Sequence, residues 1–335
     1  MRIGIPNALF TSYHLPFWQE FFMQLGMDIV VSGDSCKETI DIGSKLIPHE
    51  FCIPVKVFLG HIVDLLSQKV DLILLPRMID KKNHEFFCPK LTGLPEIVKY
   101  ALNLDDSLFF SPEVICNGLN PQIVRYPQPK IKSMRTLRQA ELKAEQNWQW
   151  TLERCRKEQS TLLQIARDLK NSSSADQIQV GLLGYAYILY DLWMSKATIQ
   201  TLGSLDTHIS TWEMVESEKI ESRLKELKRP MFWNFGRILL GAGLNFLADP
   251  KIDGVIYVTP FGCGPDSITV KLLSLQAAIT HKPFLQITLD EHSEDGHLKT
   301  RLEAFVDMLV QGKEGQSFEN NFSLFRTGTR LSENV

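Results

Sequence analysis

The chain has 335 residues, of which 44% are hydrophobic and 22% are charged. That length fits two domains of ordinary size, and no stretch approaches the roughly 18 uncharged apolar residues that a membrane helix requires. A formal net charge of -3 argues against the broad basic face with which proteins hold the phosphate backbone of nucleic acid. We therefore expect neither a membrane nor a nucleic-acid partner.

The first residues, MRIGIPNALF, are apolar but lack the small-residue cleavage site of an export signal, and they are more typical of an opening strand. We therefore expect a cytoplasmic protein. In that reducing compartment the six cysteines fit metal ligands, reactive thiols or core residues better than a disulfide framework.

Apolar, β-branched runs alternate with helical patterns from the N-terminus to about residue 130. The predicted strands are Ile3–Ile5, Met27–Val31 and Val70–Leu75, and the predicted helices are Phe17–Leu25, Lys37–Leu46, Val55–Ser67 and one that follows a loop within Cys88–Leu104. This alternation of strands and helices is typical of βαβ units in a parallel sheet. We predict an N-terminal α/β domain over residues 1–130 that carries Cys52 and Cys88.

Residues 131–175 form a predicted helical connector. From Thr136 to Leu169 the sequence is charged, poor in glycine and proline, and has apolar residues near helical spacing, which indicates one long helix or a helical hairpin. The polar cluster Asn171–Ser174 favours a loop and marks the predicted domain boundary.

The alternation resumes in a predicted C-terminal α/β domain over residues 176–335, which carries Cys263. Its predicted strands are Gln177–Leu183, Gly254–Val258 and Phe284–Leu289, with helices that begin near Leu189 and cover Met231–Leu247. The predicted fold class is α/β, with two doubly wound, Rossmann-like or flavodoxin-like parallel-sheet domains joined by a long helical segment. Ligands of such sheets sit beyond the carboxyl ends of strands, and Pro76, Tyr185 and Cys263 all follow predicted strands.

Three cysteines lie in breaks that contain proline or glycine: Cys52 in EFCIPVK, Cys88 in FFCPK and Cys263 in PFGCGPDS. Such loops can direct thiolates towards one point. None of the three has a CxxC partner. Spacing alone is therefore only weak support for a metal site. Two alternatives to an iron-sulfur site stay open: packing residues of a cluster-free binding protein, and a zinc site completed by a histidine such as His61.

The remaining cysteines are interpreted as structural or incidental. Cys155 lies on the predicted long helix and Cys116 in a predicted irregular segment. Cys36 follows a predicted N-cap at Ser35, where a helix N-terminus would lower the pKa of a thiol and make it reactive.

Several segments carry a resemblance to a known family. The chain closely resembles the activase-related branch of the 2-hydroxyacyl-CoA dehydratase family in MRIGIPNALF, EFCIPVKVFLGH, VDLILLPRMI, CPKLTGLPEIV and LDEHSEDGHLKTRLEAFVDML. The resemblance covers most of both predicted domains. It implies an oxygen-sensitive [4Fe–4S] cluster held by the thiolates of Cys52, Cys88 and Cys263, with a fourth site that is open or has a non-cysteine ligand.

We also expect Lys56, His61 and Tyr187 to lie around such a cluster. Lys56, near the start of a predicted helix, could tune the cluster potential through its charge. The sequence departs from the family pattern at Gly184–Tyr187, where relatives often carry His or Arg before Pro, although Tyr187, Tyr190 and Asp191 match. A strand-end turn with packing aromatic residues is the alternative interpretation of this segment.

Acidic residues and histidines also gather near the C-terminus. Asp290, Glu291 and His292, with His297, could suggest a divalent metal site. We prefer a structural role, in which opposite charges hold the final helix on the sheet and Arg301 pairs with a carboxylate.

The resemblance leads to two hypotheses about function. In the first, the chain is a reductase or dehydratase component that accepts a low-potential electron from a separate ATP-hydrolysing activator and passes it to a small substrate such as an acyl-CoA. In the second, it is a non-catalytic electron-transfer or accessory subunit that needs a related cluster-bearing chain to form an active site. The expected protein partners are thus the activator and either a related cluster-bearing subunit or a second copy of the chain. No catalytic base, CoA-recognition motif or nucleotide-binding loop is recognisable, so the sequence assigns no catalytic residue.

Overall fold

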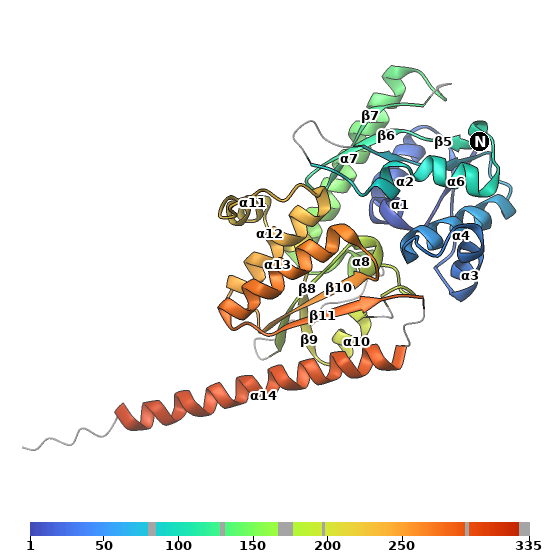
Figure 1. Ribbon diagram of the computed structural model, residues 1–335. Coiled ribbons are helices and arrows are strands. Elements are labelled where there is room, and N and C mark those ends of the chain that lie inside the picture. Colours follow the sequence, from blue (N-terminus) through green and yellow to red (C-terminus); the bar gives the residue numbers. More distant parts are fainter. Residues whose placement is uncertain (80–84, 128–130, 167–176, 196–197, 292–294, 328–335) are drawn as a thin grey trace, which may run out of the picture.

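The structure is a computed structural model that describes residues 1–79, 85–127, 131–166, 177–195, 198–291 and 295–327, with side chains up to residue 313 (Figure 1). It contains two four-stranded sheets and a smaller three-stranded sheet. Within those ranges, no helix is both long and apolar enough to cross a bilayer.

The first sheet lies in the N-terminal half and has the strand order β2-β1-β3-β5. Its strands, all parallel to their neighbours, are β1 (Arg2–Ile5), β2 (Asp28–Val31), β3 (Leu72–Leu74) and β5 (Phe109–Phe110). The helices of this half are α1 (Leu9–Tyr13), α2 (Leu15–Gln24), α3 (Lys37–Leu46), α4 (Ile53–Ser67), α5 (Pro89–Thr92) and α6 (Leu94–Leu102), followed by the 3-10 turn η1 (Asp106–Leu108). The strand β1 buries Ile3 and Ile5 completely, as expected of a parallel strand that helices cover.

Helix α4 is packed inside this half, and every residue from Ile53 to Ile62 is buried. It meets α3 at two glycines. A Cβ on Gly43 would lie 1.8 Å from the carbonyl oxygen of Lys56, and a Cβ on Gly60 would lie 2.0 Å from that of Thr39. The two backbones are therefore in direct contact, and this contact fixes the axis of α4.

A three-stranded sheet that the sequence did not predict lies in the same half. It has the order β4-β6-β7 and consists of β4 (Arg77–Met78), β6 (Glu113–Asn117) and β7 (Asn120–Arg125). Gly118 turns the chain between β6 and β7 with a φ of +62°, a conformation that favours glycine. Cys116 lies buried in β6, so the prediction of an irregular segment there was wrong.

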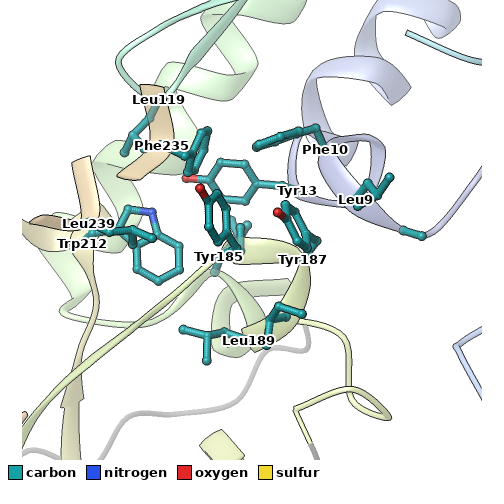
Figure 2. Close-up of a cluster of buried hydrophobic side chains, with 14 of the residues drawn as sticks. Leu9, Phe10, Tyr13, Leu119, Tyr185, Tyr187, Leu189, Trp212, Phe235 and Leu239 are labelled. Atoms are coloured by element: carbon teal, nitrogen blue, oxygen red, sulfur yellow. The ribbon is translucent and has the colours of Figure 1, made fainter. Parts of the chain in front are cut away.

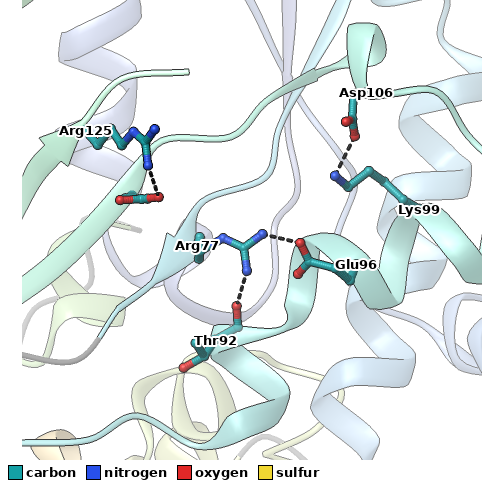
Figure 3. Close-up of polar contacts among 7 residues, drawn as sticks. Arg77, Thr92, Glu96, Lys99, Asp106 and Arg125 are labelled. Atoms are coloured by element: carbon teal, nitrogen blue, oxygen red, sulfur yellow. Dashed lines mark hydrogen bonds and ion pairs between the residues drawn. The ribbon is translucent and has the colours of Figure 1, made fainter. Parts of the chain in front are cut away.

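Polar contacts attach β4 of this small sheet to α5 and α6, and α6 to η1 (Figure 3). Arg77 on β4 donates a hydrogen bond of 3.0 Å to the carbonyl oxygen of Thr92, the last residue of α5, and pairs with Glu96 on α6. Lys99 on α6 pairs with Asp106 at 2.5 Å. These contacts anchor the short helix α5, which begins directly after Cys88.

Helix α7 (Met134–Glu158) and the short α8 (Leu162–Ala166) fall in the predicted connector. The Ser133 hydroxyl caps α7 by accepting a hydrogen bond of 3.2 Å from the Thr136 N–H, and Gln159 ends the helix in a left-handed conformation. The domain boundaries near residues 130 and 175 stay predictions. The proposed loop Asn171–Ser174 lies outside the described residues.

The second four-stranded sheet lies in the C-terminal half and has the order β11-β10-β8-β9. Its strands, again all parallel, are β8 (Ile178–Gly184), β9 (Thr207–Ser210), β10 (Gly254–Pro260) and β11 (Phe284–Leu289). The other elements are α9 (Ala186–Leu189), α10 (Thr198–Ser204), η2 (Trp212–Met214), α11 (Ser217–Lys225), α12 (Asn234–Ala248), α13 (Gly264–Thr280) and α14 (Asp295–Thr327). Helices α12 and α13 cover one face, and α10 and α14 lie on the other (Figure 1).

The two four-stranded sheets have the same topology. Numbered from the first strand of each half, both have the order 2-1-3-4. Strands 2 and 3 therefore lie on opposite sides of strand 1, and the strand order reverses between strands 1 and 3. The predicted fold class is confirmed. The predicted helix from Leu189 was wrong: α9 ends there, and the Asp191 carboxylate accepts a hydrogen bond of 2.8 Å from the Met194 N–H, which turns the chain.

Candidate functional site

Each of the three predicted ligands is the N-cap residue of a helix. Cys52 precedes α4, Cys88 precedes α5 and Cys263 precedes α13. All three helices have a proline at their first or second position, where its missing N–H costs no hydrogen bond. The thiols therefore stand at helix starts, and at the longer helices α4 and α13 the dipole favours negative charge.

The three thiols lie close enough to interact electrostatically, although they come from both halves of the chain. Burial raises the pKa of Cys52, while Lys90 opposes that rise and Cys88 adds to it. Burial also raises the pKa of Cys263, and Asp266, Cys52 and Cys88 contribute. Without a metal, Cys52 and Cys263 are therefore neutral thiols, which release protons when they bind one.

An aromatic wall, formed by Phe10, Tyr185, Tyr187 and Phe235, closes the junction between the halves (Figure 2). Tyr187 meets Phe10 edge-on with ring centroids 5.4 Å apart and stacks on Tyr185 at 5.1 Å. Phe235 packs against Phe10 at 4.7 Å and Tyr185 at 6.0 Å. Because Phe10 follows β1 and both tyrosines follow β8, the wall joins the strand-reversal points of the two sheets.

Both tyrosines of the aromatic wall are neighbours of the thiols. Burial raises the pKa of Tyr185 and Tyr187 well above the ordinary value, and Cys263 is among the groups that raise it further. The two phenols therefore stay neutral. They present a dry, uncharged surface to the cysteines.

Two side chains of α4 hold the junction from the N-terminal half. Lys56, 3% exposed, donates a hydrogen bond of 2.7 Å to Glu291, which follows β11. His61 contacts the Ser32 hydroxyl through Nδ1 at 2.9 Å and the Ser35 hydroxyl through Nε2 at 2.8 Å. Lys56 therefore bridges the two halves directly, whereas His61 acts through a serine.

The chain of hydrogen bonds through Ser35 fixes the protonation of His61. The Ser35 hydroxyl donates its proton to Asp191 of the C-terminal half, so it must accept from Nε2–H of His61. Burial lowers the pKa of His61 to about 4. His61 is therefore neutral at physiological pH and carries its proton on Nε2.

A pocket of about 350 Å³ opens beside Cys263. Its polar lining comes from β10, β11 and α13 and includes Thr259, Ser267, Lys271, Gln286 and Thr288. This volume is at the small end of the range for ligand pockets, and hydroxyls with one lysine suit a small polar molecule.

Comparison with protein-family models identifies the family of the chain. A family model described as CoA enzyme activase uncharacterised domain matches residues 2–215, more than half of the chain, and one described as 2-hydroxyglutaryl-CoA dehydratase, D-component, matches residues 243–309. The chain belongs to the 2-hydroxyacyl-CoA dehydratase and activase-related family. The first match contains Cys52 and Cys88, and the second contains Cys263. The comparison with curated proteins gave no match.

The dehydratase D-component family is known for iron-sulfur clusters. We therefore ask whether the residues at the junction of the two halves have the chemistry to hold such a cluster. Among the residues that the structure describes, no three His, Cys, Asp or Glu side chains stand close enough to hold a single metal ion. His61 is a poor candidate for a zinc ligand, because its ring nitrogens both contact serines. A cubane cluster needs a wider spacing, because each thiolate binds a different iron. Soft sulfur donors at helix starts, behind an aromatic wall, fit such a cluster.

Sequence reasoning missed Lys90 as a neighbour of Cys52 and Phe10 as a member of the aromatic wall. The Lys90 ammonium donates to the carbonyl oxygen of Glu50 at 2.8 Å and lies 5.0 Å from the centre of the Phe51 ring, which holds its charge near Cys52. The segment CPK pointed to Lys90, because a lysine two residues after the predicted ligand Cys88 is expected to lie near the group of thiols. Nothing local pointed to Phe10, which reaches Tyr187 only through the fold.

Three further sequence predictions need correction or restriction. Cys36 itself caps α3 in place of Ser35, and it is exposed. Arg301 donates to the carbonyl oxygen of Gln286 at 2.6 Å and so ties α14 to the sheet, and it pairs with no carboxylate among the residues that the structure describes. In the proposed divalent site, Glu291 pairs with Lys56, and His292 lies outside the described residues.

Proposed function

We propose that Cys52, Cys88 and Cys263 hold a [4Fe–4S] cluster in an iron-sulfur component of a dehydratase-like system. The chain then accepts a low-potential electron from an ATP-hydrolysing activator and passes it to a small substrate such as an acyl-CoA. The observation that supports this proposal is the meeting of three thiols, from both halves of the chain, at three helix starts. Family membership supports a dehydratase-component or activase-like role and implies an ATP-dependent activator in the same system.

Each neighbouring group has a defined task in this proposal. A bound cluster supplies one-electron chemistry at low potential. The helix starts and Lys90 favour the negative charge of the thiolates. Tyr185 and Tyr187 exclude water without adding charge. Lys56 and His61 hold the two halves together, so they act on the cysteines through position.

An accessory role without catalysis is the second candidate. Asp266, a buried carboxyl that helps to raise the pKa of Cys263, accepts hydrogen bonds from Tyr257 at 2.5 Å and Thr259 at 2.6 Å, and burial raises its own pKa to about 6. Both of its oxygens are thus engaged, which makes Asp266 a poor general base. This observation favours a subunit that transfers electrons and relies on another chain for proton transfer.

The cluster assignment is tested by anaerobic purification, iron and sulfide analysis, and electron paramagnetic resonance. We expect about four irons per chain in the wild type and loss of iron and signal in Cys52→Ala, Cys88→Ala and Cys263→Ala. The matched control is Cys36→Ala, because Cys36 is also a helix N-cap but is exposed at α3. A folded, reconstituted wild type that holds no iron would refute the cluster and favour a binding protein.

A turnover assay distinguishes an enzyme component from an accessory subunit. An enzyme component should convert substrate once the activator and ATP are added. An accessory subunit should take up the electron, seen as a change in its resonance signal, but should stay silent until a partner chain is supplied.

A further inference from the structure

A row of exposed apolar side chains follows the outer face of α13, which we call the outer stripe. Its members are Ile268, Leu272, Leu275 and Ile279, with exposed fractions of 41, 39, 51 and 70%. The opposite face of the same helix is also apolar, but it is buried and packs against α12. Single exposed hydrophobic residues are normal, whereas a continuous row on one helix face marks a binding surface.

The outer stripe has the geometry of a helix-pairing seam. At 100° per residue its four side chains fall within an arc of about 60°. Their spacings of four, three and four residues are those of alternating a and d positions in a heptad repeat. Lys271 is the only charged residue between positions 268 and 279, and a core depleted of charge is typical of protein interfaces.

The order of residue types in the outer stripe is symmetric. Read in either direction, it is Ile-Leu-Leu-Ile with the same spacings. A two-fold axis across the middle of α13 therefore places Ile268 against Ile279 of a second copy, and Leu272 against Leu275 of that copy. An unrelated partner would require no such symmetry.

We propose that two copies of this chain associate through the outer stripe, with α13 packed antiparallel against α13. The antiparallel arrangement also sets the two helix dipoles in opposite directions, which is favourable. Phe261, 69% exposed just before Cys263, extends the apolar surface beyond the helix start. The proposal is independent of the cluster, and it gives the expected second copy a specific surface.

Sedimentation equilibrium of the full chain, with and without bound iron, tests the proposal. We expect a reversible wild-type dimer in both states. Leu272→Glu, which buries a carboxylate near the two-fold axis, should raise the dimer dissociation constant at least about 100-fold. Leu142→Glu is the matched control, since Leu142 is 58% exposed on α7, and it should leave the constant unchanged.

Ala278 tests the orientation of the two helices. In the antiparallel pair, exposed Ala278 lies on the same side of the seam as Lys271 of the second copy. Ala278→Glu should therefore tighten the dimer about fivefold, through two symmetric ion pairs, and Ala278→Lys should weaken it by a similar factor.

Three results would overturn the proposal. The first is a wild type that stays monomeric at about 100 µM, well above micromolar affinity. The second is a Leu272→Glu variant that is as dimeric as the wild type while its circular dichroism remains native. The third is a monomeric wild type whose outer stripe is needed only for electron uptake from the activator, which would assign the stripe to a different protein.

Discussion

Helices α4 and α13 both begin at a predicted cluster cysteine with a proline in the first turn, yet their surroundings differ. Helix α4 is buried over its first ten residues, from Ile53 to Ile62, and touches α3 backbone to backbone. Helix α13 buries one face and leaves an apolar stripe open on the other. The comparison teaches that Cys52 is fixed by an inner core contact, whereas Cys263 sits on a helix that remains available to a partner.

The largest expected effect is on the backbone contact of α4. In Gly43→Ala the new Cβ would lie 1.8 Å from the carbonyl oxygen of Lys56, and two packed backbones cannot both move aside. We expect a loss of about 3 kcal/mol or more in the free energy of unfolding, measured by urea denaturation. Gly203→Ala is the control, because no atom of the described residues outside its own stretch of helix lies within 4 Å of its Cβ position, and it should be neutral or slightly stabilising.

The second prediction concerns pH and the buried His61 of α4. Its pKa is about 4 in the folded state, against 6.5 for the unfolded residue, so the folded state binds fewer protons between these values. Its contribution to stability is therefore present above pH 6.5 and is lost as the pH falls towards 4, by up to about 3 kcal/mol.

His61→Gln should accordingly have a flatter stability profile than the wild type between pH 7 and pH 4. Urea denaturation at pH steps across that window provides the measurement. Parallel profiles for the two proteins would mean that His61 is not held in its neutral form, and that the hydrogen-bond chain to Asp191 is not as described.

The third prediction tests the corresponding contact of α13. In Gly243→Ala on α12 the new Cβ would lie 2.6 Å from a methyl carbon of Leu273, whose side chain can move. We expect a loss of about 1–2 kcal/mol, less than for Gly43→Ala. An equal or larger loss would mean that α13 is held as rigidly as α4, and the contrast between the two helices would fail.

The last prediction concerns the ion pair between the halves, whose expected effect is no larger than that of Gly243→Ala. Glu291→Gln leaves Lys56, 3% exposed, without its carboxylate, but Glu291 itself is 26% exposed and solvent screens the pair. We expect a loss of about 1–2 kcal/mol. Glu303→Gln is the control: its 3.8 Å contact with Lys299 is exposed, and the change should cost less than about 0.5 kcal/mol.

Much of the fold could be predicted because its signals are local. The β-branched run Phe284–Leu289 and the helix Lys37–Leu46 both appear with the predicted bounds. The sheet β4-β6-β7 could not be predicted as a unit, since β4 has only two residues and pairs with β6, a segment far away in sequence. The sequence predicted Ser35 as the N-cap of α3, but the N-cap residue is Cys36. The Ser35 hydroxyl is instead hydrogen-bonded to His61 and Asp191.

The candidate site was predictable only in part. Family resemblance pointed to the three cysteines, and their helix-start positions follow from the prolines beside them. Their approach to one another, the aromatic wall and the contact of Lys56 with Glu291 depend on how the halves meet. No local pattern encodes that meeting.

The division of the cysteines between the halves has a consequence during synthesis. Domains fold from the N-terminus as the chain leaves the ribosome, so Cys52 and Cys88 emerge well before Cys263. Until the C-terminal half folds, Phe10 also lacks the rings of Tyr187 and Phe235. A nascent chain thus leaves Cys52 and Cys88 unprotected and the Phe10 side chain uncovered. On the proposed cluster assignment, delivery of iron should follow release of the complete polypeptide.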